Sequence, residues 1–311
     1  MNKRIFVLGE ALVDCIEQAD GQLKPILGGS PFNLARAAAL QDASVTYLNP
    51  LSQDAYGGQF AQRLEGDGVK FNAQRSHLPT SLALIRLRDG QPDYSFYREG
   101  VADRDYSMDS VLQRIESQAA GILHTGSLAL LPPDHSKVMT ILERARAWGW
   151  TISVDVNLRP RVAIDLGNYL AAVQAVIPYA DWIKASDEDL ELLGFENPSP
   201  ERASTIAKAW MAKGASHVAL TFGGQGACLF VGNQHAIARA APVEVVDTVG
   251  AGDTFWGTCL ADWATEPNEM EQRVALTLQR AVQAAAINCG RQGCQPPTRA
   301  ELMQNSPSVI T

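Results

Sequence analysis

Short apolar runs alternate along the chain with amphipathic segments. The apolar runs have the composition of buried strands and occur at residues 5–8, 45–48, 121–125, 151–154, 182–184 and 218–221. The amphipathic segments carry their apolar positions at helical spacing and include residues 34–40, 138–148 and 204–211. This alternation predicts β–α–β units that form a mostly parallel sheet with helices on both faces, a three-layer α/β/α core. Ligands of such sheets bind at the carboxyl ends of the strands.

Two regions interrupt this alternation of apolar and amphipathic segments, and their patterns predict β-hairpins. Residues 12–16 and 23–27 flank a polar turn at 19–22, and residues 80–88 and 93–98 flank an Asp-Gly turn at 89–92. Because both hairpins are inserted in an otherwise β–α chain, we expect them to form a small separate β-sheet that serves as a lid or as a dimer surface. The predicted organisation is a core and a discontinuous lid, with the core at residues 1–11, 28–69 and 105–311 and the lid at residues 12–27 and 70–104.

The composition is that of a folded, acidic protein. The 311 residues are 46% hydrophobic and 19% charged, and 34 Asp and Glu outnumber 26 Lys and Arg, which gives a formal charge of −8. This balance argues against electrostatic binding to nucleic acid or to an anionic membrane. The sequence has no apolar run of membrane-spanning length, its amino end is too polar for a signal peptide, and its five cysteines lack CxxC spacing. We therefore expect a cytoplasmic protein with reduced thiols.

The strongest chemical signal is the segment DTVGAGD at residues 247–253. An apolar run at 243–246 predicts a strand before it, and the pattern from Thr254 to about residue 263 predicts a helix after it. Gly250 and Gly252 allow a sharp turn whose amides point into one space at the positive end of that helix, which suits an anion. Asp253 would place a carboxylate beside this anion, in position to accept a proton from an attacking hydroxyl. The alternative is that Asp253 only complements the helix dipole.

Neither of the two common phosphate-binding loops accounts for this segment. The pattern GxxxxGK[ST] does not occur, and the dinucleotide pattern GxGxxG fails because Phe255 stands where the third glycine belongs. This departure also disfavours a nicotinamide-dependent oxidoreductase. Any phosphate must therefore be bound by a loop of another kind.

A second signal lies near the amino terminus, in the segment GGSPFN at residues 28–33. Ser30 is a good N-cap and Pro31 a good first residue of a helix. Capping does not require the glycines Gly28 and Gly29, which would allow a ligand to approach closely. Asn33 offers a donor and an acceptor, and Asp14 can accept from two hydroxyls, so together these residues suit a polyol.

The pairing of GGxPxN near the amino end with DTxGAGD near the carboxyl end resembles the ribokinase or PfkB family of sugar and nucleoside kinases. Within that family the chain is most similar to the fructokinases, and also to ketodeoxygluconate and aminoimidazole riboside kinases. The residues that carry this similarity are Gly9-Glu10, Asp14, Tyr97-Arg98, Gly126-Ser127 and the segment DVNLRP at 155–160. The resemblance runs nearly end to end and implies a ribokinase-like core with a β-sheet lid.

The resemblance also implies roles for individual residues. Asp253 would be the catalytic base, and the amides of Gly250, Ala251 and Gly252 would form an anion hole for the transferring phosphoryl group. The sugar hydroxyls would be bound by Asp14, Gly28, Gly29 and Asn33, with Arg98 and Arg159 contacting substrate or phosphate. ATP would be contacted by Thr221, Gly223 and Gly226 at its phosphates and ribose, and by the segment with Asn288 and Gly293 at its adenine.

Metal ions are implied at two places where the chain departs from the family pattern. The segment SDED at 186–189 has Asp189 where the family usually has a Glu that organises Mg²⁺ through water, and it also matches a helix capping box. Asp247 and the carbonyl of Val249 match positions that bind a monovalent cation such as K⁺ in the family, although Pro297 replaces one expected hydroxyl-bearing residue. Family members frequently dimerise through their lids, so a homodimer is expected.

The function expected from this resemblance is ATP-dependent phosphorylation of a sugar hydroxyl. Fructose is the preferred acceptor, followed by 2-keto-3-deoxygluconate and then by a riboside. A different class is also open: a non-catalytic protein that binds nucleotide or sugar, since Ser52 and Asp189 both depart from the family pattern.

Overall fold

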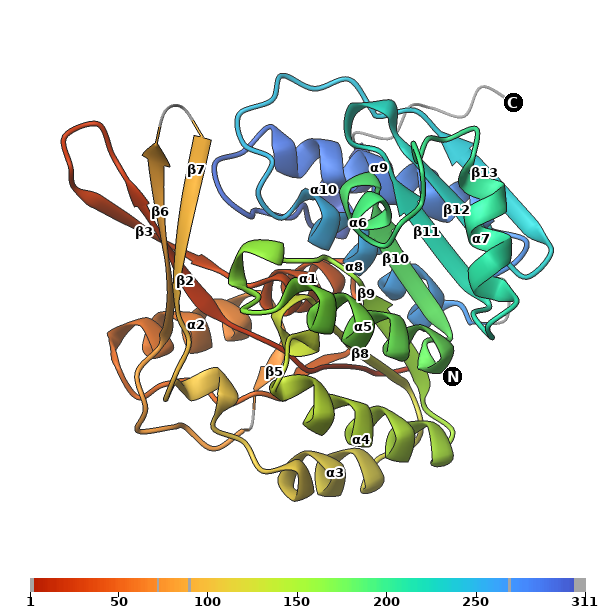
Figure 1. The fold of residues 1–311 in the computed structure, drawn as a ribbon. Helices are drawn as coiled ribbons and strands as arrows, with labels where there is room; N and C mark the ends of the chain where they lie inside the picture. Colours follow the sequence, from red (N-terminus) through yellow and green to blue (C-terminus); the bar gives the residue numbers. More distant parts are fainter. Residues whose placement is uncertain (1–2, 72, 89–90, 268–269, 305–311) are drawn as a thin grey trace.

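The larger of two β-sheets forms the centre of the molecule (Figure 1). The computed structural model describes residues 3–71, 73–88, 91–267 and 270–304. The larger sheet has the strand order β13-β12-β11-β10-β9-β8-β1-β4-β5 and is parallel except where β12 and β13 join it. Its strands are β1 (Ile5–Val7), β4 (Val45–Tyr47), β5 (Lys70–Phe71), β8 (Ile122–Gly126), β9 (Thr151–Asp155), β10 (Trp182–Ser186), β11 (His217–Thr221), β12 (Ala227–Val231) and β13 (Gln234–Ala238). The strands predicted from the six apolar runs are all confirmed.

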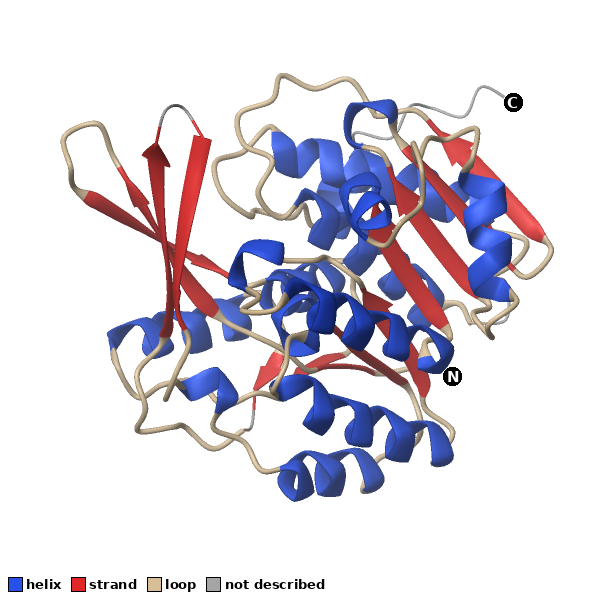
Figure 2. Ribbon diagram, viewed as in Figure 1, coloured by secondary structure: helices blue, strands red, loops and turns tan. Residues whose placement is uncertain are grey.

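The smaller sheet stands away from the larger one, as Figures 1 and 2 show. Its order is β3-β2-β6-β7, and its strands are β2 (Leu12–Glu17), β3 (Leu23–Gly28), β6 (Ser81–Arg88) and β7 (Gln91–Tyr97). Both predicted hairpins are present, while the tip of the second, residues 89–90, lies outside the described residues. One boundary needs correction: Lys70–Phe71, assigned to the lid by the sequence, pairs with β4 in the larger sheet.

Helices cover both faces of the larger sheet and give the three predicted layers. Successive residues of β1 point to opposite faces, so Phe6 packs in one hydrophobic core and Ile5 and Val7 in the other. The first core is closed by α3 (Met108–Glu116), α4 (Asp134–Ala147), α5 (Leu166–Val176) and α7 (Ala203–Met211). The second is closed by α1 (Ser30–Leu40), α2 (Ala55–Gly66), α8 (Ala251–Thr265) and α9 (Val274–Cys289), while α6 (Asp187–Leu192) and α10 (Arg299–Gln304) are short.

Helix α8 lies between α1 and α9 and is buried along nearly its whole length, from Asp253 to Ala264. Gly257 makes the close approach of α1 and α8 possible, because a Cβ at this position would lie 2.8 Å from that of Ala37. A helix enclosed in this way has little freedom to shift. Its first turn is therefore held in a fixed position relative to α1.

The strand predicted at residues 243–246 is not formed, and this prediction is wrong. Val245 and Val246 are each 60% exposed, and the backbone of Val246 donates to the carbonyl of Cys289 at the end of α9 instead of pairing with a strand. A run of β-branched residues favours a strand only when it can pack on a sheet. Here the carboxyl end of the run bonds to the last residue of α9 instead.

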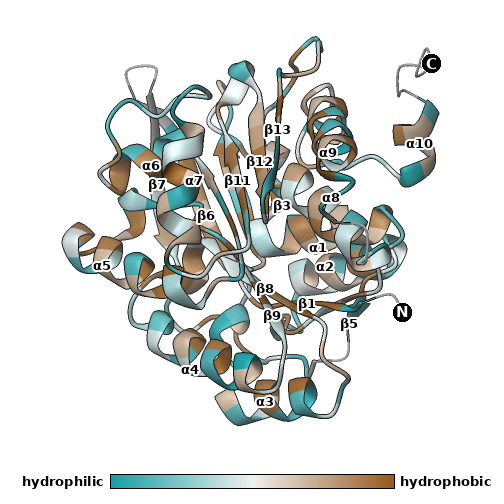
Figure 3. Cartoon of the chain, turned by 90° about the vertical axis from the view of Figure 1, so that its right-hand side faces the viewer, coloured by the Kyte–Doolittle hydropathy of each residue, from teal (hydrophilic) through white to brown (hydrophobic). Residues whose placement is uncertain are grey.

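Hydrophobic residues concentrate between the layers. In Figure 3 the strands of the larger sheet are largely brown, whereas the helices around them carry teal patches. In the part of the chain that the structure describes, none of the helices combines the length and apolarity that crossing a membrane requires.

Candidate functional site

The first turn of α8 presents free backbone amides. Gly250 adopts a left-handed conformation with φ 73°, which favours glycine, and the helix begins at the next residue. The Ala251 amide donates to the Thr248 carbonyl at 3.2 Å, while no protein acceptor is found within the described residues for the amides of Gly250 and Gly252. Two donors at the positive end of a helix are suited to an anion. Gly252 is helical, so the turn requires glycine only at position 250.

Asp253, in the same turn, is held by two side chains of α1. Its Oδ1 accepts from the Ser30 hydroxyl at 2.7 Å, and its Oδ2 accepts from the Asn33 amide at 3.0 Å. Burial raises the pKa of Asp253, and the two hydrogen bonds oppose that rise. A buried, oriented carboxylate with a raised pKa is suited to accept a proton.

Ser30 is not the N-cap that the sequence predicts. Gly29 occupies the N-cap position with φ 105°, and no side chain caps α1. The Ser30 hydroxyl is instead directed to Asp253, 223 residues further along the chain. A Cβ on Gly29 would lie 2.6 Å from the Glu10 carbonyl oxygen, so this glycine lets the start of α1 pack against the segment between β1 and β2.

Asp14 lies on β2 and belongs to the same electrostatic environment as Asp253. Burial raises the pKa of Asp14 to about 6, the Arg159 guanidinium lowers it, and the Asp253 carboxylate raises it further. The bare backbone of Gly28 makes room for this carboxylate, because a Cβ there would come within 2.4 Å of Asp14 Oδ2. The structure therefore gathers Asp14, Gly28, Asn33 and Asp253 around one region between the lid and α8.

The two arginines of the predicted substrate site lie in different surroundings. Arg159 is partly exposed, and its Nη1 donates to the Asn157 side chain at 2.6 Å and to the Leu158 carbonyl at 3.0 Å. Arg98 is buried at the root of the lid, 4.0 Å from Asp103 and 3.8 Å from Asp134. The charge of Arg98 is thus already balanced by protein carboxylates.

The predicted nucleotide residues Thr221, Gly223 and Gly226 lie at the carboxyl end of β11. Thr221 pairs with Ser186 across β10 and β11, so the two strand ends meet. Gly223 and Gly226 have φ of 50° and 105°, and a Cβ on Gly226 would lie 2.0 Å from the Ala238 carbonyl. Position 226 therefore requires glycine, because its φ is positive and because a side chain there would clash with the Ala238 carbonyl.

The loops before α8 and after α9 are fastened to each other. Asp247 accepts from the amides of Val249 at 3.0 Å and Gly293 at 2.8 Å. Asn288 is fully buried, and it donates to the Val249 carbonyl and accepts from the Gln295 amide, both at 2.8 Å. These bonds hold the loops in place with protein groups alone.

Asp189 is used by the backbone, and the alternative capping-box interpretation of SDED is confirmed. Its Oδ2 accepts from the amide and the hydroxyl of Ser186, both at 2.8 Å, and its Oδ1 accepts from the Leu158 amide at 2.7 Å. Three accepted bonds leave little capacity for a direct metal bond. Over the described ranges, no group of three or more His, Cys, Asp or Glu side chains is arranged to hold a metal ion.

The sequence interpretation missed a buried ion pair beneath this site. Lys184 on β10 places its Nζ 3.0 Å from both carboxylate oxygens of Asp155 on β9, and both side chains are buried. Burial raises the pKa of Asp155 to about 7, and Lys184 opposes that rise. The detectable signal was a lysine inside an apolar run, because a charge in a doubly covered strand is costly unless it is paired.

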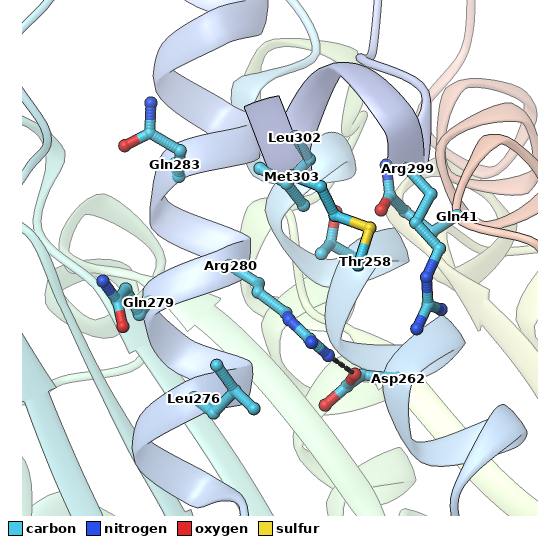
Figure 4. A pocket seen from close by; sticks show the side chains of 10 residues that line it. All are labelled: Gln41, Thr258, Asp262, Leu276, Gln279, Arg280, Gln283, Arg299, Leu302 and Met303. Carbon is cyan, nitrogen blue, oxygen red and sulfur yellow. Dashed lines mark hydrogen bonds and ion pairs between the residues drawn. The ribbon is translucent and has the colours of Figure 1, made fainter. Parts of the chain in front are cut away.

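A separate cavity of about 250 Å³ lies among α8, α9 and α10 (Figure 4). Thr258, Asp262 and Arg280 line it, and Asp262 accepts from Arg280 at 2.6 Å. Its lining shares none of the predicted site residues. This cavity is distinct from the candidate site.

Known proteins resemble the chain over nearly its full length. A fructokinase of Rhizobium leguminosarum bv. trifolii is 28% identical over 283 residues, 89% of this chain and 85% of that protein. Fructokinase-1 of Zea mays is 28% identical over 316 residues, 96% of each chain.

Solved structures confirm the ribokinase-like fold. The fructokinase of Xylella fastidiosa with bound ATP matches with a TM-score of 0.85 at 24% identity, covering 98% of this chain and 99% of that one. The aminoimidazole riboside kinase of Salmonella enterica, complexed with aminoimidazole riboside and an ATP analogue, matches with a TM-score of 0.81 at 20% identity and covers 97% and 99%. The family of pfkB carbohydrate kinases matches residues 2–301, so the chain belongs to this family and is a phosphotransferase whose acceptor is a sugar hydroxyl.

Proposed function

We propose that the protein is a fructokinase, which transfers the γ-phosphoryl group of ATP to a primary hydroxyl of fructose. The observation that carries this proposal is the meeting of Asp253, the free amides of Gly250 and Gly252, and the Asp14 carboxylate across α8, α1 and the lid. The fructokinase names of the relatives support the choice of sugar. A solved relative from Vibrio cholerae O395, with fructose, ADP and calcium bound, supports it as well.

The residues divide the work of transfer between them. Asp253 accepts the proton of the sugar hydroxyl, whose oxygen bonds to the γ-phosphorus while the bond to the bridging oxygen breaks and its electron pair leaves with ADP. The amides of Gly250 and Gly252 stabilise the charge that gathers on the phosphoryl oxygens. Asp14, Gly28, Gly29 and Asn33 position the sugar, and Arg159 extends the positive field toward it.

ATP and metal ions fit this site to different degrees. The amides of α8 and the glycine turn at 223–226 suit the phosphates of ATP. Mg²⁺ bound to those phosphates would neutralise charge, but Asp189 already accepts from two backbone amides and the Ser186 hydroxyl and is a poor direct ligand. Any part it plays would act through water, as the resemblance implies. Asp247 and the Val249 carbonyl likewise already accept protein donors, so they are poor direct ligands for K⁺.

The charges favour a neutral sugar over 2-keto-3-deoxygluconate. Asp14 and Asp253 would repel a substrate carboxylate, and Arg98 is already balanced by Asp103 and Asp134. Fructose carries no ionised group, and a carboxylate such as Asp14 binds its hydroxyls well. The riboside alternative is also neutral and is left to experiment.

The smaller sheet, residues 12–28 and 81–97, would act as the lid. Its strand β3 reaches the nucleotide side, since a Cβ on Gly293 would lie 3.6 Å from the Ile26 side chain. Closure there would exclude water and limit hydrolysis of ATP. The homodimer through this sheet stays a prediction, which the mass of the protein in solution tests.

The test is ADP release measured with a panel of acceptors: fructose, 2-keto-3-deoxygluconate, aminoimidazole riboside and no sugar. We expect fructose to give the highest kcat/KM. A higher value for another acceptor would overturn the choice of sugar. ATP and sugar binding without any turnover would instead identify the non-catalytic binding protein.

A further inference from the structure

We propose that the cavity among α8, α9 and α10 binds a small organic anion, whose carboxylate or phosphate group contacts Arg280 and Arg299. The cavity measures about 250 Å³, which is less than the roughly 300–1,000 Å³ of sites for drug-sized ligands. It therefore suits a molecule of on the order of ten non-hydrogen atoms. Its wall shares no residue with the proposed transfer site, so the inference stands apart from the proposed function.

The two arginines of the cavity keep most of their donors unused by the protein. A guanidinium carries five N–H donors. Arg280 uses one of them, from Nη1 to Asp262 at 2.6 Å (Figure 4). Arg299 forms no hydrogen bond within the described part of the chain, and its ion-pair partner Asp42 lies 3.7 Å away with 71% of its side chain exposed. Such an exposed pair contributes little, so the Arg299 guanidinium is available to a ligand.

The acidic side chains near the cavity are already paired. Asp262 in its wall is buried and accepts from Arg273 at 3.0 Å as well as from Arg280. Glu266, at the carboxyl end of α8, interacts electrostatically with Arg280 and Arg299 but is itself bonded to Arg273. The charged residues of the lining are Asp262, Arg280 and Arg299, so cations outnumber carboxylates there although the protein has a formal charge of −8. This local charge favours an anionic ligand.

The apolar part of the lining favours an organic ligand over an inorganic ion. Leu276, Arg280 and Gln283 are four and three residues apart, so they lie on one face of α9. Met303 borders the same cavity from α10 (Figure 4). Leu276 and Met303 are 41% and 61% exposed, and a ligand that rests against them would remove apolar surface from water. The ligand should therefore combine one anionic group with an apolar body.

The test titrates the wild-type protein with four probes, followed by NMR: benzoate, phenyl phosphate, the neutral analogue benzamide, and inorganic phosphate. Saturating fructose and AMP-PNP are present to occupy the proposed transfer site. We expect at least one of the two organic anions to bind with a Kd of about 1 mM or lower. Benzamide should bind at least about tenfold more weakly than benzoate, because it lacks the charge that the guanidiniums bind.

Several results of this titration would overturn the proposal. They are a Kd well above about 1 mM for both organic anions, benzamide that binds as tightly as benzoate, and displacement of the organic anions by AMP-PNP. Binding of inorganic phosphate without either organic anion would show an adventitious ion only, and it would overturn the proposal as well.

Variants then locate the bound anion. Arg299→Met breaks no hydrogen bond between described residues, so it should fold, weaken anion binding at least about tenfold and leave benzamide binding unchanged. Arg280→Met should also weaken anion binding, but with a lower Tm because Asp262 loses a partner. Arg63→Met, at an exposed arginine of α2, is the matched control and should bind every probe as wild type does. Wild-type affinity for the organic anions in Arg299→Met would contradict the proposal.

Discussion

The first turn of α8 and the root of the lid serve opposite halves of the proposed reaction, and they are built by different means. At α8 the backbone provides the site, through a left-handed Gly250 and free helix amides. At the root of the lid, side-chain charges provide it, with Arg98 buried between Asp103 and Asp134 and with Asp14 on β2. Backbone donors bind any phosphate, whereas side chains distinguish acceptors. In the proposed function, α8 would therefore determine the phosphoryl transfer and the lid would determine which sugar is accepted.

The largest effect is expected from Asp253→Asn, which alters the α8 half alone. The amide keeps a similar shape but is a poor base, so kcat should fall on the order of 10² or more. Fructose should bind nearly as well as before, by calorimetry. Glu188→Gln, at an exposed acid in the first turn of α6, is the control and should keep wild-type kcat. Wild-type-like turnover of Asp253→Asn would remove the assigned base.

A change confined to the lid half should affect sugar binding instead. In Gly28→Ala the new methyl group would meet Asp14 Oδ2 at 2.4 Å and displace that carboxylate. We expect KM for fructose to rise at least about tenfold with kcat changed less than about threefold, because uniform binding is lost. Gly58→Ala is the matched control, since a Cβ there meets nothing within 4 Å. An equal fall in kcat and in kcat/KM for Gly28→Ala would contradict the assignment of sugar binding to the lid and of phosphoryl transfer to α8.

The sequence was a better guide to the fold than to the contacts of the site. Local patterns predicted six strands of the larger sheet, both hairpins and the helix after DTVGAGD, because each depends on residues near in sequence, but they did not predict β12 or β13. The bond from Ser30 to Asp253 joins positions 223 apart, and local capping rules predicted a different role for that serine. The Lys184–Asp155 pair likewise depends on strand register. Residues 243–246 failed as a strand, and the Val246 amide donates to Cys289 at the end of α9 instead.

Sugar binding should depend on pH through Asp14, on the lid. Burial raises the pKa of Asp14 to about 6, so the carboxylate that we propose accepts sugar hydroxyls is lost as pH falls through that value. KM for fructose should rise about fourfold between pH 7.5 and pH 5.5, from the ionised fraction of such a group. Asp14→Asn should bind fructose more weakly and lose this pH dependence. An unchanged pH profile in Asp14→Asn would assign the titration to another group.

Ionisation of Asp14 should strengthen sugar binding but lower the stability of the folded protein. Because the folded-state pKa of Asp14 lies above its ordinary value of 3.8, folding takes up a proton between these values, and the free energy of unfolding falls as pH rises from about 4 to about 6. Asp14→Asn should therefore be more stable than wild type above pH 6, on the order of 3 kcal/mol, and equal to it below pH 4. Urea unfolding at pH 4 and pH 7.5 measures this difference, and a variant less stable at pH 7.5 would refute it.

The smallest effect is expected from exchanging the monovalent cation. Asp247 and the Val249 carbonyl already accept amide donors, so the loop before α8 keeps its shape without an ion. Activity in K⁺ should exceed activity in tetramethylammonium by less than about threefold, well below the order-of-10² effect of losing an oriented charge. Loss of nearly all activity without K⁺ would show that the loop depends on the ion.

A crystal structure with fructose and AMP-PNP bound would show whether Asp253 and the first turn of α8 meet at the reacting atoms. We expect a primary hydroxyl oxygen within about 3.2 Å of the Asp253 carboxylate, with the γ-phosphoryl group against the amides of Gly250 and Gly252. Fructose bound away from Asp14 and Asp253, or a γ-phosphate remote from the first turn of α8, would contradict it.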